Sequence, residues 1–164
     1  MKILVSDPIS EKGMKILTDA EFEIIDCQEN EIDPSILQDI DGWVIRSGTK
    51  INREFLDHTE NLKVIGRAGV GVDNIDIREA TRHGVVVMNT PDSNTISAAE
   101  HSFALIAALS RNVQTGHMTL AGGEWRRDEL GGVELHGKTL GVVGLGRIGR
   151  EVIKRVLSFD MKVM

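Results

Sequence analysis

Residues 139–150 read Thr-Leu-Gly-Val-Val-Gly-Leu-Gly-Arg-Ile-Gly-Arg, and this stretch decides the fold of the second half of the chain. An apolar run leads into Gly-x-Gly-x-x-Gly, and the pattern of an amphipathic helix follows. Gly144 allows a sharp turn from strand to helix, Gly146 lets a pyrophosphate approach the backbone, and Gly149 lets the helix pack closely on the strand. The stretch therefore predicts a strand–turn–helix unit that binds a dinucleotide.

The start of the predicted helix supplies further groups for a phosphate. Its first amide groups lie at the positive end of the helix dipole, and Arg147 is placed to reach a phosphate oxygen. The alternative is a glycine-rich turn that binds no ligand. A Walker loop is excluded, because no Gly-Lys-Ser/Thr sequence closes the motif.

The second strand of such a Rossmann domain begins near Met161, and the sequence ends at Met164. An acidic residue that binds the ribose hydroxyls normally closes that strand, so the choice between NAD and NADP stays open at this point. We expect the chain to be the first part of a longer protein, truncated inside this domain.

The first half of the chain alternates short apolar runs with amphipathic stretches, which predicts an α/β fold with a parallel sheet and helices on both faces. Side chains suited to helix N-caps are Ser10, Asp33 and Asn52, and Asp76 with Glu79 has the spacing of a capping box. Gly84 suits the left-handed position after a helix. We expect strands, buried on both faces, at Lys2–Val5, Glu21–Ile25, Gly42–Arg46, Lys63–Arg67 and Gly84–Met88, and helices at Ser10–Thr18, Pro34–Asp39, Asn52–His58 and Ile77–His83.

Turn residues crowd the segment 89–94, and we place a domain boundary there, with residues 1–92 in one domain and 93–164 in the next. A helix is expected from Thr95 to Asn112, with Ser97 and Glu100 at capping-box spacing. It is apolar nearly all round, which indicates cover on more than one side. An interdomain helix and a plain core helix both fit this pattern.

Composition narrows the function. The 164 residues are 41% hydrophobic and 27% charged, and 25 acids against 19 bases give a net charge of −6. This balance argues against a nucleic-acid binder. Cys27 is the only cysteine, so neither an intrachain disulfide nor a cysteine zinc site is expected. No apolar run approaches the length of a membrane span, so no membrane insertion is expected. We expect a cytoplasmic protein that binds no metal.

Two arginines follow predicted strands, at Arg46 and Arg67. Ligands of open parallel sheets bind beyond the carboxyl ends of the strands, and two guanidinium groups there suit a doubly charged anion. Gly69 and Gly71 let backbone amides approach a carboxylate. The competing roles are a surface salt bridge for Arg46 and a loop-holding contact for Arg67.

Three polar residues near these loops have open roles. Asn94 is a substrate contact or a turn residue. Asp73 and Asn74 are better explained as loop and helix-cap residues than as catalysts.

The whole chain resembles the D-2-hydroxyacid dehydrogenase family. Arg-Ala-Gly-x-Gly-Val-Asp-Asn at residues 67–74 is the most specific stretch, and the others lie at residues 44–50, 87–91, 97–100 and 137–151. The resemblance implies a flavodoxin-like substrate domain with an inserted NAD-binding domain. It also implies NAD-dependent hydride transfer from C2 of 3-phosphoglycerate, giving 3-phosphohydroxypyruvate in the first step of serine synthesis, and a homo-oligomer in the full-length protein.

The resemblance further implies roles for single residues. Substrate-binding positions are Arg46, Ser47, Arg67, Gly69 and Asn94, and cofactor-binding positions are Val70, Gly144, Gly146, Arg147, Ile148 and Gly149.

Oxidation of a hydroxyl group needs a general base, usually a histidine. None of the five histidines matches the family's catalytic histidine, which lies far downstream, so we assign no catalytic residue to this chain. We expect His83 to be structural and His101 to be a core or interface residue. The alternatives in function are another family enzyme, such as a hydroxypyruvate or glyoxylate reductase or a D-lactate dehydrogenase, and an NADH-sensing protein similar to co-repressors.

Overall fold

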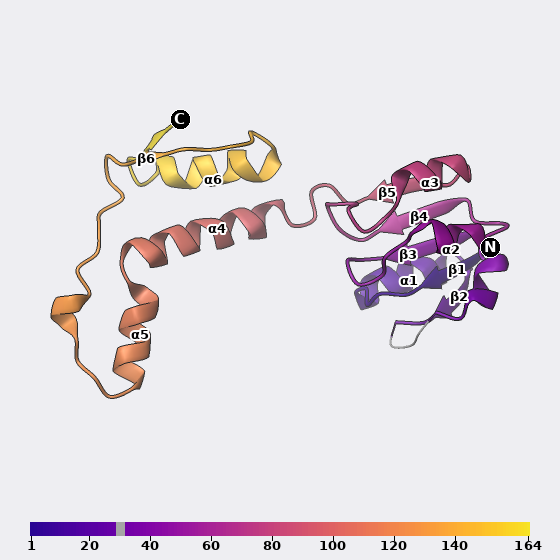
Figure 1. Ribbon diagram of the computed structural model, residues 1–164, viewed down its shortest axis with the longest axis horizontal. Helices are drawn as coiled ribbons and strands as arrows, with labels where there is room; N and C mark the ends of the chain where they lie inside the picture. Colours follow the sequence, from indigo (N-terminus) through magenta and orange to yellow (C-terminus); the bar gives the residue numbers. More distant parts are fainter. Residues whose placement is uncertain (29–31) are drawn as a thin grey trace. The chain divides into compact units, whose positions relative to one another are not determined.

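The computed structural model describes residues 1–28 and 32–164. The chain divides into two compact units, Met1–Ser93 and Asn94–Met164, and each is described by itself (Figure 1).

The first unit is built on one parallel sheet of five strands in the order β2-β1-β3-β4-β5. This is the flavodoxin-like order, so the predicted α/β fold with a parallel sheet is confirmed. The strands are β1 (Lys2–Val5), β2 (Glu23–Asp26), β3 (Gly42–Ile45), β4 (Val64–Arg67) and β5 (Val86–Asn89).

Two strands begin two residues later than predicted, for a local reason. Glu21 has a φ of +56° and Gly84 a φ of +69°, so the chain is still turning at both positions. Gly84 thereby takes the left-handed position expected after a helix.

The connections are α1 (Glu11–Asp19), the 3₁₀ helix η1 (Pro34–Gln38), α2 (Arg53–Asp57) and α3 (Ile77–Arg82). The predicted N-caps are confirmed, since Ser10, Asp33, Asn52 and Asp76 each accept a hydrogen bond from a backbone amide of the first turn. The capping box is only half formed, because the Glu79 carboxylate pairs with Arg82.

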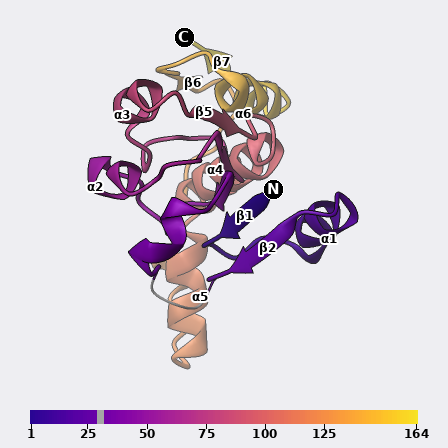
Figure 2. The same ribbon diagram turned by 90° about the vertical axis from the view of Figure 1, so that its right-hand side faces the viewer.

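The two faces of the sheet are covered unequally. Figure 2 shows α1 on one side and α2 and α3 on the other. The main core lies on the side of α2 and α3, where Leu4, Trp43 and Ile65 are fully buried. On the α1 side, Val86 and Met88 are each 59% exposed. The prediction that all strands are buried on both faces is therefore wrong at both edge strands. Strand β5 is open on this face, which α1 alone covers, and Glu23 and Asp26 of β2 are exposed.

The second unit contains α4 (Thr95–Ser110), α5 (Val113–Ala121), the 3₁₀ helix η2 (Arg127–Glu129), β6 (Thr139–Leu140), α6 (Arg147–Leu157) and β7 (Lys162–Val163). Strands β6 and β7 pair in parallel. Helix α4 packs on α6, where Arg155 Nη2 lies 2.9 Å from Glu100 Oε1 and the rings of Phe103 and Phe159 are 4.8 Å apart.

Two expectations for this unit are wrong. Asn94, not Ser97, is the N-cap of α4, and Ser97 Oγ donates to the Asn94 carbonyl oxygen. The helix expected to reach Asn112 ends at Ser110, because Asn112 adopts a φ of +52°. The separate helix α5 that follows was not predicted. No helix in the described ranges has the length and apolarity needed to cross a membrane.

Candidate functional site

The loops after β1, β3 and β4 carry the candidate anion-binding residues of the first unit. Asp7, Arg46 and Arg67 all lie at the carboxyl edge of the sheet, because the three strands are parallel neighbours. The structure thus brings Arg46, Ser47, Arg67 and Gly69 to adjacent loops, as the strand-end rule requires.

Asp7 organises the loop after β3. Its side chain is almost buried, with 6% of the residue exposed. The carboxylate accepts hydrogen bonds from the amides of Arg46 (2.6 Å) and Thr49 (3.0 Å) and from Thr49 Oγ1 (3.0 Å). A Cβ added to Gly48 would lie 2.5 Å from Asp7 Oδ1. The loop is therefore wrapped tightly around one carboxylate, and only glycine fits at position 48.

This wrapping leaves two consecutive amides available. Within the described residues, no protein group accepts a hydrogen bond from the amides of Ser47 and Gly48. Successive free amides in a tight loop form a concave site for an anion. Arg46 is exposed beside them, and its Nη1 donates to the Pro8 carbonyl oxygen at 3.3 Å. The salt bridge considered for Arg46 is not formed with any residue that the structure describes.

Arg67 is fixed by its own loop. Its side chain is 10% exposed, and Arg67 Nη2 lies 3.7 Å from Asp73 Oδ1. Arg67 Nε donates to Asn74 Oδ1 at 2.7 Å. A Cβ on Gly69 would lie 2.5 Å from Arg67 Nη1, so glycine makes room for the guanidinium. The loop-holding contact considered for Arg67 is therefore present.

Asn74 connects the two loops. Its Nδ2 donates to the carbonyl oxygens of Arg46 (2.7 Å) and Thr49 (2.6 Å). Asp73 and Asn74 are loop residues between β4 and α3, as expected, but the helix-cap role is wrong, because Asp76 caps α3. Sequence reasoning missed Asp7 as a site residue, although it follows β1 and the strand-end rule used for the arginines applies to it equally.

Val70 is held from β5. Asn89 Nδ2 donates to the Val70 carbonyl oxygen at 2.6 Å, and the Thr90 amide donates to the Gly69 carbonyl oxygen at 2.9 Å. The end of β5 thereby fixes the loop that carries Gly69 and Val70.

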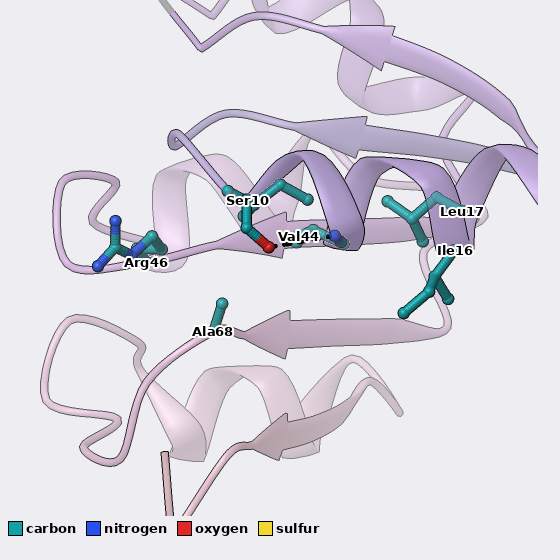
Figure 3. Close-up of a pocket in the computed structure, with 8 residues that line it drawn as sticks. Ser10, Ile16, Leu17, Val44, Arg46 and Ala68 are labelled. Carbon is teal, nitrogen blue, oxygen red and sulfur yellow. Dashed lines mark hydrogen bonds between the residues drawn. The ribbon is translucent and has the colours of Figure 1, made fainter. Parts of the chain in front are cut away.

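A hollow of about 410 Å³ lies between α1 and the sheet. Figure 3 shows the lining residues Ile16 and Leu17 on α1, Val44 on β3, and Arg46 just beyond the end of that strand. The lining is apolar apart from Arg46 and Ser10. Such walls do not compensate the desolvation of a phosphate, so the hollow suits apolar side chains better than it suits an anion.

The glycine bend of the second unit has the predicted geometry. Gly144 has a φ of +101°, which favours glycine. A Cβ on Gly149 would lie 2.5 Å from the Gly144 carbonyl oxygen. A Cβ on Gly146 would meet no atom within 4 Å, so the space beside this N-cap residue of α6 is open. Arg150 Nε donates to the Leu145 carbonyl oxygen at 3.0 Å and steadies the bend.

The remaining candidate site residues lie at the starts of helices α6 and α4. Arg147 is the first residue of α6, and Ile148 is half-buried behind it. Asn94 is the exposed N-cap of α4 and makes no side-chain cap bond.

The roles predicted for His83 and His101 can be compared with their contacts. His83 is structural, since Nδ1 lies 2.9 Å from the Glu79 carbonyl oxygen and Nε2 lies 3.2 Å from Asp57 Oδ1. His101 was expected to be a core or interface residue; it is exposed on α4, so the core position is wrong. In the part of the chain that the structure describes, no three His, Cys, Asp or Glu side chains gather as a metal site would require.

Comparison with known proteins agrees with this architecture. The family model described as the D-isomer specific 2-hydroxyacid dehydrogenase catalytic domain matches residues 3–159. The chain is 47% identical over 165 residues to the D-3-phosphoglycerate dehydrogenase of Methanocaldococcus jannaschii and 47% identical over 164 residues to that of Bacillus subtilis. It is 31% identical, with a TM-score of 0.90, to an NAD-dependent formate dehydrogenase from Staphylococcus aureus solved in complex with NAD.

These proteins are longer than the present chain. The alignments cover 100% and 99% of this chain but 32% and 31% of the two curated relatives. The alignment with the formate dehydrogenase covers all of this chain and 55% of the solved one. The chain therefore spans about a third of the curated relatives that it matches.

Proposed function

The chain belongs to the D-isomer specific 2-hydroxyacid dehydrogenase family, and we propose that the protein of which it is part is an NAD-dependent D-3-phosphoglycerate dehydrogenase. The reaction is oxidation of C2 of D-3-phosphoglycerate to 3-phosphohydroxypyruvate, the first step of serine synthesis, in the cytoplasm. Met1–Ser93 is the substrate domain, and Asn94–Met164 is the first part of the NAD-binding domain.

The observation that carries the proposal is the occurrence in one chain of two different anion-binding devices. The first unit presents the exposed Arg46 beside the free amides of Ser47 and Gly48. The second unit presents the open Gly146 at the start of α6. A substrate with a carboxylate and a phosphate suits the first device, and a diphosphate suits the second.

The residues of the glycine bend fit a dinucleotide. The space that a Cβ would fill at Gly146 lets a pyrophosphate lie against the backbone, and the first amides of α6 can donate to it. Arg147 and Ile148 flank that position, and Val70 offers an apolar contact for the nicotinamide end. NAD, when bound, supplies the hydride acceptor. The relatives named above include an NAD-dependent enzyme solved with NAD, which supports NAD over NADP.

In the first unit, Arg46, Ser47, Arg67 and Gly69 bind the anionic groups of the substrate, and Arg67 also holds the loop that Gly69 belongs to. Asn94 contributes one further polar contact to the substrate. Since no proton acceptor is assigned to this chain, the general base comes from elsewhere in the full-length protein.

The full-length protein is a homo-oligomer in this proposal. Helices α4 and α5 and the loop after them expose large apolar side chains within their unit, such as Leu109 and Trp125, the latter 78% exposed. Residues 105–133 carry three acids and three bases, a balance that suits a surface pairing with a copy of itself.

NADH formation tests the proposal directly. Full-length protein mixed with NAD and D-3-phosphoglycerate should produce NADH, followed by its absorbance, at a higher kcat/KM than with unphosphorylated 2-hydroxy acids. The 164-residue chain alone should show no turnover. Preference of the full-length protein for D-lactate or glyoxylate, or turnover by the short chain, would refute this assignment.

A further inference from the structure

The Asn74 side chain joins two loops through three hydrogen bonds, which use both of its N–H donors and its oxygen. Its oxygen accepts from Arg67 Nε at 2.7 Å, and its nitrogen donates to the carbonyl oxygens of Arg46 at 2.7 Å and Thr49 at 2.6 Å. We propose that Asn74 is a positioning residue that locks the Arg67 guanidinium to the loop of residues 46–49 and so sets the geometry of the substrate's anion site. This inference rests on the proposed function.

The fold does not need this side chain to hold the local backbone. The Ile51 amide donates to the Asn74 carbonyl oxygen at 2.8 Å, and the Asp76 amide donates to the Ile51 carbonyl oxygen at 2.9 Å. Ile51 and Ile75 are buried with 1% and 5% exposed. Backbone hydrogen bonds and packing therefore anchor residues 74–76. The Asn74 side-chain amide is not needed to hold this backbone in place.

Only a carboxamide provides this combination of bonds. The acceptor must face the cationic Arg67, while two donors must face carbonyl oxygens. Aspartate has nearly the same shape and still accepts from Arg67, but it has no donor, and its charge would face the carbonyl oxygens of Arg46 and Thr49. Asn74→Asp thus keeps the tie to Arg67 and breaks the tie to the loop, whereas Asn74→Ala breaks both.

The loop of residues 46–49 is also held by Asp7. Asp7 holds the amides of Arg46 and Thr49, so the loop is bound through its amides by Asp7 and through its carbonyl groups by Asn74. With both contacts present, the amides of Ser47 and Gly48 keep one orientation relative to Arg67. Loss of the Asn74 contact therefore weakens substrate binding more than it slows the chemical step.

The test compares Asn74→Ala and Asn74→Asp with a matched control, Asn61→Asp. Asn61 precedes β4 at the opposite edge of the sheet, and its Nδ2 donates to the Gln38 carbonyl oxygen at 3.0 Å. In the full-length protein, both Asn74 variants should raise KM for D-3-phosphoglycerate about tenfold or more, the size expected for the loss of the two hydrogen bonds to the Arg46 and Thr49 carbonyl oxygens, which both variants break. The value of kcat, KM for NAD and the control variant should change by less than about threefold.

A second measurement separates this inference from the proposed function. In the 164-residue chain labelled with ¹⁵N, both Asn74 variants should shift the amide resonances of Ser47 and Gly48, and Asn61→Asp should leave them in place. If the Ser47 and Gly48 signals stay unmoved, or if Asn74→Asp keeps the wild-type KM, the inference is overturned. If the signals move while wild-type protein does not oxidise D-3-phosphoglycerate, the positioning role stands and the proposed substrate is wrong.

Discussion

Asp7 and Asn74 determine where the candidate anion-binding groups of the first unit lie. Each side chain bonds to residues that are far away in sequence, at separations of 39 positions for Asp7 with Arg46 and 28 for Asn74 with Arg46. Neither residue needs to touch a ligand to affect binding, because the loop of residues 46–49 takes its shape from both.

Asp7→Ala should destabilise the protein by about 1–3 kcal/mol, because it leaves three part-buried donors without their acceptor. Urea unfolding of the 164-residue chain measures the change. Asp26→Ala is the control, since Asp26 is exposed and its carboxylate bonds only to neighbouring Gln28 among the residues described. An Asp7 variant as stable as the control would show that the loop is not held by this carboxylate.

Gly149→Ala and Gly146→Ser should separate folding from ligand binding at the bend. A Cβ at Gly149 meets the Gly144 carbonyl oxygen at 2.5 Å, so overpacking should cost about 1–3 kcal/mol of stability. Serine at position 146 fits the open space and is a good N-cap residue. Its stability should match that of wild type, while the NAD affinity of the full-length protein falls at least about tenfold.

Thermal unfolding and calorimetric titration with NAD measure the two effects. If Gly146→Ser bound NAD as tightly as wild type, the glycine would be a turn residue without a ligand, which is the alternative that the sequence left open.

Arg46, Arg67 and the three glycines could be proposed from the sequence because the strand-end rule and the glycine motif each depend only on a strand and the residues that follow it. Asp7 follows the same rule and was overlooked. Asn74 was not predictable as a connector, since its partners become neighbours only through the pairing of β3 with β4 and of Ile51 with Ile75.

At the scale of elements, α4 and α6 are joined by a charged cluster as well as by packing. Glu151 accepts from Lys154 and, at 3.0 Å, from Arg155 Nη1, and Arg155 in turn reaches Glu100 at 2.9 Å. The hydrogen bonds that Glu151 accepts hold its pKa below the usual value; the bond from Lys154 has the larger effect and the bond from Arg155 the next.

This lowered pKa gives the cluster a defined pH dependence. A carboxyl group whose pKa is lower in the folded state stabilises that state above its unfolded pKa, about 4.3, and loses this contribution as the pH falls through the folded value. Glu151→Gln should therefore lower the thermal midpoint near neutral pH and have no effect at pH values well below about 4. A midpoint difference that stays constant from neutral to acidic pH would show that the effect is not electrostatic.

Element prediction succeeded where the signal was local. The caps at Ser10, Asn52 and Asp76 depend on a few adjacent residues, and each formed. Helix α5 was missed because its start depends on the left-handed Asn112, which separates two stretches of similar apolar character. The exposure of β5 was missed because a strand sequence does not show which helices cover the sheet.

At the scale of the whole protein, the two units carry different candidate binding groups. The unit Met1–Ser93 provides charged and amide donors at a sheet edge, and the unit Asn94–Met164 provides a glycine bend at a helix start. Flavodoxin-like order and a glycine bend occur with many functions, so the proposed choice of substrate rests on the charged groups of the first unit.

The specificity of Arg46→Ala in the full-length protein tests the central claim most directly. The measurement is the ratio of kcat/KM for D-3-phosphoglycerate to that for D-lactate, with NAD as cosubstrate. Arg53→Ala is the control, because Arg53 is exposed on α2 and pairs with Asp57. We predict that the ratio falls at least about tenfold in Arg46→Ala and stays unchanged in the control. An unchanged ratio in Arg46→Ala would contradict the claim that this loop recognises the phosphorylated substrate.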